Sequence, residues 1–204
     1  MRKKYTKLDL PLEQIFNFLF NDLKKIGKMC SGVMTAIRER AGSEKIPKKT
    51  ILLKKGQVCD SCYFVVSGLL RAYSLKGNKE VTLWVMTTGD VAIGVTSFYD
   101  QAPSEEYIEA LEDTVVVSLS YDHLQWIYEN YVEFNVIGRK LTEKYHKLFN
   151  MRLCTMVDSR EERYNKFVKD YPGLVDRIHG KYLASLLGMS PSYLSTIKTA
   201  LKLL

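Results

Sequence analysis

The sequence has no long apolar run, and no stretch approaches the roughly 20 residues that a membrane-spanning helix requires. The first residues, Met1–Tyr5, are basic, but neither an apolar signal core nor a small-residue cleavage site follows them. Residues 15–23 are apolar but are interrupted by Asn17, Asn21 and Asp22, which is typical of an amphipathic helix. We therefore expect a soluble protein that remains in the cytoplasm and does not contact a membrane.

Cysteine is sparse and histidine is rarer still. The four cysteines are too scattered for a dense disulfide framework, as expected for a reducing compartment; they are Cys30, Cys59, Cys62 and Cys154. The histidines lie far apart, with no Cys or carboxylate at metal-ligand spacing; they are His123, His146 and His179. We expect no metal site and no cofactor.

Motifs of catalysis are missing as well. The chain contains no Ser-His-Asp nucleophile elbow, no phosphate-binding P-loop and no glycine-rich dinucleotide fingerprint. No histidine lies between residues 46 and 119, where a metal-dependent enzyme built on β-strands would need one. The sequence thus predicts that the protein is not an enzyme.

Positive charge is distributed unevenly along the chain. Residues 1–138 carry 17 Lys/Arg and 17 Asp/Glu, whereas residues 139–204 carry 13 Lys/Arg and 6 Asp/Glu and so hold the whole net charge of +7. No Lys or Arg lies between Glu80 and Glu133, a span with eleven acidic residues. Because basic side chains displace counterions from phosphates, the last third is predicted to bind a polyanion; an ordinary solvated basic surface is the alternative.

The apolar periodicity changes twice along the chain. Up to about residue 45 apolar residues recur every three or four positions, which predicts helix. Seven short β-prone runs separated by glycine-containing turns follow, and they predict an antiparallel roll or sandwich: Ile51–Leu53, Cys62–Val66, Leu69–Leu75, Val81–Met86, Val91–Val95, Tyr107–Leu111 and Thr114–Leu119. Helical spacing then returns, with Ser120 and Ser159 as expected N-caps and Pro172-Gly173 as a helix end.

A long helix is predicted between Tyr131 and Val157. Its apolar residues recur at alternating spacings of three and four, broken by Lys144, as in a coiled-coil seam. A second copy of the chain would supply the partner helix, so the dimerisation candidates are Phe134, Ile137, Leu141, Leu148 and Met151. The alternative is that this face packs against the chain's own β-strands.

Residues 180–199 predict a helix-turn-helix. Leu183, Ala184 and Leu187 give a short first helix an apolar face, and Gly188 lies where the turn needs a left-handed residue. Ser190 and Pro191 are a favoured N-cap and first residue for the second helix. The second helix buries Leu194, Ile197 and Leu201 and would enter the major groove of DNA. A helical hairpin with a polar outer face is the alternative.

The outer face of the second helix is rich in hydroxyl groups. Its candidates for contact with bases are Ser192, Ser195, Thr196 and Thr199. Its candidates for contact with phosphates are Ser190, Tyr193, Lys181, Lys198 and Lys202. Because Arg, Asn and Gln are absent from this face, we expect sequence recognition to depend partly on DNA shape and on dimer spacing.

Several sequence anchors resemble the Crp/Fnr (cyclic AMP receptor/fumarate-nitrate regulator) family, and most closely its Bacteroidetes-type branch. These anchors are Lys55-Gly56-Gln57, Tyr63–Arg71, Gly89-Asp90, Ile108–Asp113, Glu162-Arg163-Tyr164 and the helix-turn-helix. The resemblance covers roughly residues 45–204 and implies an α+β chain. The expected domains are an N-terminal part with helices and a cyclic-nucleotide-binding-like β-roll (1–130), a dimerisation helix (131–157) and a DNA-binding helix-turn-helix (158–204). It also implies a cytoplasmic homodimer on a two-fold-related operator in double-stranded DNA, with RNA polymerase as a further partner.

The chain departs from this family at its ligand-binding positions. Members that bind cyclic nucleotides use a Glu for the ribose and an Arg-Ser pair for the phosphate, where this chain has Ile93–Thr96 and Ser104–Glu106. A phosphate there would meet repulsion rather than a guanidinium, so we predict that cyclic AMP does not control the protein. The recognition helix has Pro191, Ser192 and Thr196 where members often carry an Arg-Glu…Arg set, so no target sequence can be transferred.

A second hypothesis assigns the main function to the roll. Cys59-x-x-Cys62 resembles half of a redox or metal site, and four thiolates could hold an iron–sulfur cluster. The spacing argues against a cluster, because family members that carry one group three cysteines near the N-terminus, where this chain has only Cys30. In this alternative the protein is a small-molecule or redox sensor with a weak helix-turn-helix, and the end of the chain at Leu204, soon after the second helix, favours it.

Overall fold

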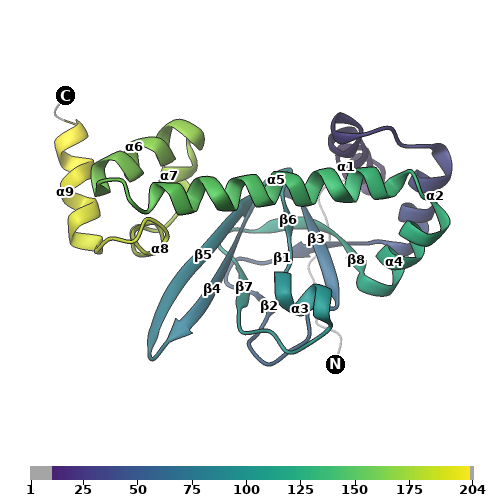
Figure 1. The fold of residues 1–204 in the computed structure, drawn as a ribbon, viewed down its shortest axis with the longest axis horizontal. Coiled ribbons are helices and arrows are strands. Elements are labelled where there is room, and N and C mark those ends of the chain that lie inside the picture. The colour runs from purple at the N-terminus through teal and green to yellow at the C-terminus, as the bar shows by residue number, and fades with distance from the viewer. Residues whose placement is uncertain (1–10, 203–204) are drawn as a thin grey trace. The chain divides into compact units, whose positions relative to one another are not determined.

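A computed structural model describes residues 11–202, and these residues form two compact units (Figure 1). The roll unit holds the chain up to Ala72 together with Val85–Glu143, and the C-terminal unit holds Tyr73–Trp84 together with the chain from Lys144 onward. The helices are α1 (Leu12–Ile26), α2 (Ser31–Arg40), α3 (Val95–Asp100), α4 (Tyr121–Asn130), α5 (Phe134–Thr155), α6 (Arg160–Asp170), α7 (Leu174–Arg177), α8 (Gly180–Leu186) and α9 (Pro191–Lys202). The strands are β1 (Gly42–Ile46), β2 (Ile51–Leu53), β3 (Ser61–Ser67), β4 (Leu69–Lys76), β5 (Lys79–Thr87), β6 (Val91–Ala92), β7 (Tyr107–Ala110) and β8 (Thr114–Ser120).

The strands form two four-stranded sheets. One sheet has the order β1-β8-β3-β6 and the other has the order β2-β7-β4-β5. Strand pairs β1–β8, β3–β8, β3–β6 and β2–β7 are antiparallel, so strands far apart in sequence lie side by side. The predicted antiparallel β-roll is confirmed.

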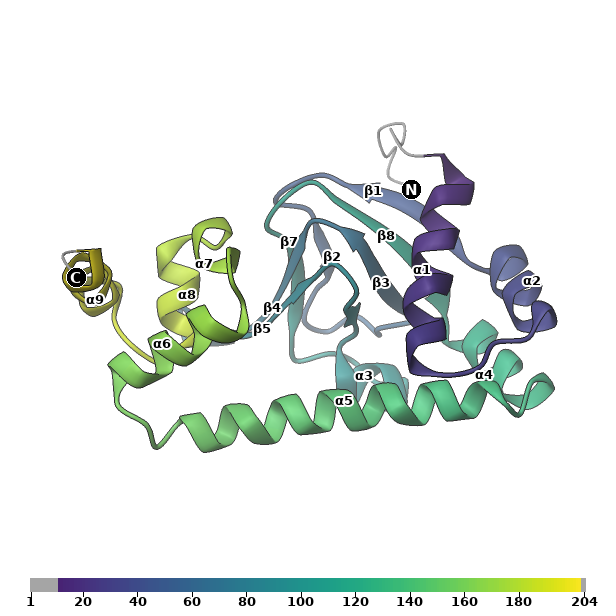
Figure 2. The same ribbon diagram turned by 90° about the horizontal axis from the view of Figure 1, so that it is seen from above.

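The β1-β8-β3-β6 sheet is covered on both faces, which explains the nearly continuous apolar sequence of β8. Successive side chains of a strand point to opposite faces of its sheet. Val65 and Val116 are fully buried on one face, while Phe64 and Val117 lie on the other, in the core shared with the helices. Figure 2 shows α1 lying alongside β3 and β8.

The helices of the roll unit line the core on the Phe64 and Val117 side of this sheet. Helix α1 buries one side of its amphipathic sequence, as the spacing predicts, and α2, α4 and the start of α5 complete the cluster. Its fully buried or nearly buried members from the helices are Ile15, Phe16, Leu19, Phe20, Leu23, Val33, Ala36, Ile37, Ile127, Phe134 and Ile137. Within residues 11–202 no helix combines the length and the apolar character needed to cross a bilayer.

Two elements differ from the expected pattern. Residues 42–46 form β1 rather than helix; they are mostly polar and pair with β8 from Gly42 opposite Ser118 to Ile46 opposite Thr114. The expected strand Val91–Val95 is only two residues long, because the backbone turns into α3. A Cβ at Gly94 would lie 2.7 Å from Leu53 Cδ2, so the absence of a side chain permits this close approach.

The helices of the C-terminal unit enclose a small apolar core. The buried side chains come from α6, α7, α8 and α9 and from the residues that directly follow α7 and α8; they are Tyr164, Leu174, Val175, Ile178, Leu183, Ala184, Leu187, Leu194 and Ile197. Helix α6 spans the predicted range and ends before Pro172-Gly173. Helix α7 has only four residues, too short for a periodic signal, and begins after the left-handed Gly173.

Candidate nucleic-acid interface

Helices α8 and α9 and the turn between them form the predicted helix-turn-helix. Gly188 has φ +66°, a left-handed conformation that favours glycine, and the Met189 N–H donates to the Ala184 carbonyl at 3.0 Å. The Tyr193 N–H donates to Ser190 Oγ at 3.2 Å, so Ser190 caps α9 as expected. Turn and cap together fix where α9 begins.

Apolar contacts orient α9 against α8. Leu183 and Ala184 of α8 are fully buried, and so, within a few per cent, are Leu194 and Ile197 of α9. The small side chain of Ala184 allows the second helix to approach closely. Leu201 lies in α9 as well, but its side chain is outside the described part of the chain.

The predicted DNA-contacting residues of α9 are exposed. Ser192, Ser195, Thr196 and Thr199 lie on the side of the helix away from Leu194 and Ile197. The hydroxyl group of Thr196 donates to the Ser192 carbonyl at 3.2 Å, and that of Thr199 donates to the Ser195 carbonyl at 3.0 Å. Ser190 Oγ and Ser192 Oγ are 3.0 Å apart and share a hydrogen bond.

The predicted phosphate-contacting residues differ from one another in exposure and in their contacts. Lys181 is exposed and Lys198 is half-buried, while Lys202 ends α9 with its side chain outside the described part. The Tyr193 hydroxyl donates to Glu161 Oε1, and the Arg160 guanidinium lies 4.8 Å from the centre of the Tyr193 ring. This hydrogen bond lowers the pKa of Glu161 and raises that of Tyr193. Tyr193 thus ties α9 to the first turn of α6, a role that helical spacing alone did not reveal.

A cavity between α6 and α9 lies beside this contact. It has a volume of about 170 Å³ and is lined by Glu161, Asn165, Tyr193, Thr196, Ile197 and Ala200. Sites for small molecules usually occupy several hundred Å³. The cavity is therefore too small for a nucleotide.

The β4–β5 hairpin segment Tyr73–Trp84 contacts α8 through polar groups. The Thr82 N–H donates to Ser185 Oγ at 2.9 Å. Nη2 of Arg152, from the end of α5, donates to the Leu186 carbonyl at 3.2 Å and to the Thr82 carbonyl at 3.4 Å. The same guanidinium lies 5.3 Å from the Trp84 ring centre, and its burial lowers the pKa of Arg152. One side chain therefore holds the hairpin, α5 and α8 together.

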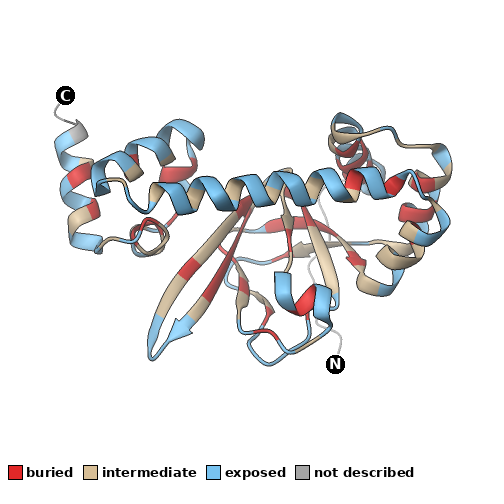
Figure 3. Cartoon of the chain, in the orientation of Figure 1, coloured by how far each residue is buried: buried red, intermediate tan, exposed pale blue. Residues whose placement is uncertain are grey.

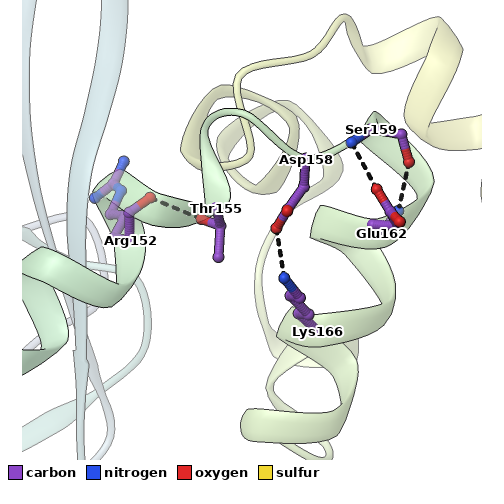
Figure 4. Close-up of polar contacts among 6 residues, drawn as sticks. All are labelled: Arg152, Thr155, Asp158, Ser159, Glu162 and Lys166. Carbon is purple, nitrogen blue, oxygen red and sulfur yellow. Dashed lines mark hydrogen bonds and ion pairs between the residues drawn. The ribbon is translucent and has the colours of Figure 1, made fainter.

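The short segment between α5 and α6 is fixed by side chains that bond to the backbone or to each other (Figure 4). The Thr155 hydroxyl donates to the Arg152 carbonyl at 2.7 Å, and Lys166 Nζ pairs with Asp158 at 2.6 Å. Ser159 caps α6 in a capping box, in which the Glu162 side chain accepts from the Ser159 N–H at 2.8 Å. These contacts determine where the chain leaves α5.

The predicted dimer seam lies partly inside the chain's own core. Phe134 and Ile137 are buried in the roll unit, and Leu141 packs against the same cluster, because a spacing of three and four also suits a helix that packs on its own chain. Leu148 is half-buried, whereas Met151 is 56% exposed. Figure 3 shows that buried residues of α5 lie near its start and that the remainder is exposed or intermediate.

Sequence periodicity missed a second set of apolar residues near the end of α5. They share high exposure and are Phe149, Leu153 and Met156. They are spaced at four and three residues, so they lie along one side of the helix and the turn that follows it. Phe149 also packs against Trp84, with ring centres 6.1 Å apart, so Leu153, Met156 and only the exposed part of Phe149 remain accessible on this side.

The interior of the roll unit contains a buried ion pair. Arg71 of β4 is fully buried, and its Nη2 lies 2.5 Å from Oε1 of Glu109 in β7. Burying an unpaired charge is very costly, so each of these residues requires the other. The sequence offered a clue, because Arg71 and Glu109 both stand in apolar β-prone runs.

The positions that match the nucleotide site of the family are occupied by internal contacts. Ser104 is buried, and its hydroxyl accepts from the Glu106 N–H at 3.0 Å and donates to the Glu106 carbonyl at 3.1 Å. Burial raises the pKa of Glu106. Lys55, from outside this stretch, pairs with the exposed Glu105 at 2.6 Å.

The cysteines are all free thiols. Burial raises the pKa of Cys59 and raises that of Cys62 to about 12, so both thiols are protonated at neutral pH. Cys154 is exposed on α5. Among residues 11–202, no three His, Cys, Asp or Glu side chains are grouped so that they could hold a metal ion.

Comparison with known proteins identifies the roll. Residues 43–131 match the sequence profile of the cyclic nucleotide-binding domain. No protein of curated function matches the chain in sequence.

The fold is shared with solved bacterial regulators. A Crp/Fnr-family transcriptional regulator from Eubacterium rectale aligns with a TM-score of 0.68 and 18% identity, covering 91% of this chain and 86% of its own. A mutant of CooA from Carboxydothermus hydrogenoformans aligns with a TM-score of 0.66 and 20% identity, covering 97% of this chain and 86% of its own. FixK2 from Bradyrhizobium japonicum aligns with a TM-score of 0.67 and 16% identity, covering 79% of this chain and 84% of its own. At these identities the likeness establishes the fold, and the Bacteroidetes-type branch stays a prediction.

Proposed function

We propose that this chain, which has a cyclic nucleotide-binding domain and the fold of the Crp/Fnr transcription regulators, binds double-stranded DNA as a cytoplasmic homodimer and regulates transcription next to RNA polymerase. The observation that carries the proposal is the helix pair α8–α9, with its capped second helix and exposed hydroxyl face. Helix α9 enters the major groove, and Lys181, Lys198 and Lys202 contact phosphates.

Charge supports the choice of a polyanionic partner. The whole net charge of +7 falls in residues 139–204. Each Lys–phosphate contact releases counterions, so replacing Lys181 or Lys198 by Ala should lower the salt dependence of DNA binding by about one unit of slope. Lys48→Ala in the roll unit, which also removes one exposed lysine, is the matched control and should leave the slope unchanged.

The dimer is proposed to form through the apolar stripe at the end of α5, namely Leu153 and Met156 with the exposed part of Phe149. An exposed apolar stripe on a helix is buried most simply against its own two-fold copy. Leu153→Lys should give monomers in sedimentation experiments with an unchanged circular dichroism spectrum, and Asn150→Lys on the same helix should leave dimers intact. A dimeric Leu153→Lys variant would contradict this seam.

The roll is proposed not to respond to cyclic AMP. The region equivalent to the nucleotide site has buried Ser104 bonded to Glu106 and no cation between Glu80 and Glu133. A ligand that binds only the folded state raises its stability by about 2.7 kcal/mol at one hundred times its dissociation constant. Because we propose that cyclic AMP does not bind, millimolar cyclic AMP should leave the melting temperature of the protein unchanged. A clear increase in the melting temperature would refute the prediction.

Genome-wide capture of DNA fragments by the purified dimer tests the function as a whole, at low and at physiological salt. A few enriched two-fold-symmetric sites that survive physiological salt are the expected result, and they would reveal the half-site spacing. Uniform binding that disappears with salt would refute sequence-specific regulation. It would leave the roll, as a small-molecule or redox sensor, as the functional part.

A further inference from the structure

We propose that α9 selects A·T base pairs through Thr196 and Thr199, each of which offers DNA a hydrogen-bond acceptor and a methyl group but no donor. The inference rests on the proposed function, because it assumes that α9 lies in the major groove. It names the class of operator that the exposed face of α9 recognises.

The hydrogen bonds of the two threonines remove their donors. Each hydroxyl group has one hydrogen, and that hydrogen is directed to the backbone four residues earlier, to the Ser192 carbonyl from Thr196 and to the Ser195 carbonyl from Thr199. Both side chains are exposed, so the lone pairs and the methyl group remain accessible. A threonine in this state accepts hydrogen bonds and makes apolar contacts.

The chemistry of the major groove then favours one base pair. An A·T pair presents the N6 amino group of adenine, which is a donor, and the methyl group of thymine. A G·C pair presents one amino group on cytosine but no methyl, and guanine adds two acceptors, O6 and N7. Both pairs present one amino donor and two acceptors, because A·T has adenine N7 and thymine O4, so the methyl group alone distinguishes them. One A·T pair therefore satisfies both functions of a threonine, while a G·C pair satisfies only one.

The rest of the exposed face of α9 does not reverse this preference, because the hydroxyl of Ser195 can donate or accept and so favours neither base pair. Between Pro191 and Thr199 the helix contains a single cation, Lys198, and its side chain is half-buried. Ser192 shares its hydroxyl hydrogen bond with Ser190 at the helix start. The strong guanine contacts of an exposed arginine are therefore missing from this face.

The test uses the full-length dimer and two matched double variants. Thr196→Ser with Thr199→Ser keeps the acceptors and removes the methyl groups, whereas Thr196→Val with Thr199→Val keeps the methyl groups and removes the acceptors. Operator sites are first selected from random duplexes by wild-type protein. Each thymine of the selected half-site is then replaced by uracil, which lacks the methyl group, and each adenine by purine, which lacks the amino group.

We expect selected half-sites in which the pairs contacted by α9 are A·T. For wild-type protein, uracil at one or more of these pairs should weaken binding about fourfold per half-site, the value of one buried methyl group. The serine variant should lose this uracil effect and keep the purine effect. The valine variant should do the reverse, losing the purine effect and keeping the uracil effect.

The outcomes separate the inference from the function on which it rests. No selected sites at physiological salt would refute the proposed function itself. Selected symmetric sites whose contacted pairs are G·C, or whose affinity is indifferent to uracil in the wild type, would support the function and refute the inference. A uracil effect that persists unchanged in the serine variant would also refute it, because another residue would then read the methyl group.

Discussion

The roll unit and the C-terminal unit are held together by different kinds of interaction. In the roll unit large apolar side chains from four helices and two strands fill a continuous core, and sheet residues such as Val65 and Val116 are fully buried. In the C-terminal unit the core is small, and hydrogen bonds between side chains and the backbone fix the helix ends: Arg152 donates to a carbonyl, and the hydroxyls of Ser159 and Ser190 accept from backbone N–H groups. Core volume should thus control the stability of the first unit, and individual polar contacts should control the geometry of the second.

The largest effect is expected from the one buried ion pair described for the roll. Arg71→Met leaves the largely buried Glu109 without the partner described here and should lower the free energy of unfolding by about 3 kcal/mol, the lower end of the range for a fully buried charge, measured by urea denaturation. Combining it with Glu109→Leu should recover most of the loss, because no unpaired charge remains. A double variant as unstable as the single one would show that packing of Arg71, rather than charge, matters.

Neighbouring residues of α5 test the role of the core. Ile137→Ala creates a cavity in the cluster of the roll unit and should cost about 2–4 kcal/mol in unfolding experiments. Val136→Ala, on the exposed side, should change stability by no more than about 0.5 kcal/mol. Equal effects at the two positions would contradict the division of α5 into a buried and an exposed side.

Arg152 tests the polar half of the comparison. Arg152→Ala removes two hydrogen bonds from a charged donor and the contact with Trp84, so the hairpin and α8 lose their common support. We expect DNA affinity to fall about tenfold, an equivalent of about 1.4 kcal/mol, with little change in the unfolding of the roll. The variant Arg152→Lys, which can still donate to both carbonyls, should retain part of the DNA affinity. Identical losses of affinity for Arg152→Lys and Arg152→Ala would mean that packing of the Arg152 side chain, rather than its hydrogen bonds, supports α8.

Two glycines of the helix-turn-helix provide a matched pair. Gly188→Ala forces a side chain into a left-handed conformation, with the new Cβ 2.9 Å from Arg163 Nη1, and should cost about 1 kcal/mol. Gly180→Ala, at the first residue of α8, meets no described atom within 4 Å and should be neutral or slightly stabilising in thermal unfolding. A neutral Gly188→Ala variant would contradict the turn geometry.

The smallest effect is expected at the surface contact between α6 and α9. The hydrogen bond from Tyr193 holds the pKa of Glu161 below its ordinary value of 4.5. The contribution of this hydrogen bond to the stability of the folded protein is therefore complete above pH 4.5 and is lost as the pH falls through the lowered pKa. Tyr193→Phe should bring the NMR titration midpoint of Glu161 back toward 4.5. An unchanged midpoint would mean that the backbone N–H of Glu161 and the charge of Arg160, rather than Tyr193, lower its pKa.

The sequence was most informative where local chemistry and burial agree. The caps at Ser120, Ser159 and Ser190, the left-handed Gly188 and the amphipathic α1 are local features, and the structure confirms each of them. The strand β1 was missed because its stability comes from pairing with β8, about 70 residues away, rather than from its own apolar pattern.

The seam of α5 shows the limit of periodicity. A spacing of three and four locates an apolar face but does not identify its partner, and Phe134 and Ile137 lie in the core of their own chain. Likewise, Tyr193 and Arg152 were beyond sequence reasoning, because their contacts with Glu161 and with the hairpin join residues 32 and 70 positions apart. Such contacts depend on the tertiary fold and leave no local signature.

The placement of the hairpin in the C-terminal unit has a consequence for synthesis of the protein. Tyr73–Trp84 leaves the ribosome about 60 residues before Lys144, which at typical rates of elongation is roughly 3–12 seconds earlier. During this interval Trp84 has neither Phe149 nor Arg152 to contact. The C-terminal unit can therefore mature only after the helices that follow Lys144 have been synthesised, and a fragment that starts at Lys144 would lack one of its own parts.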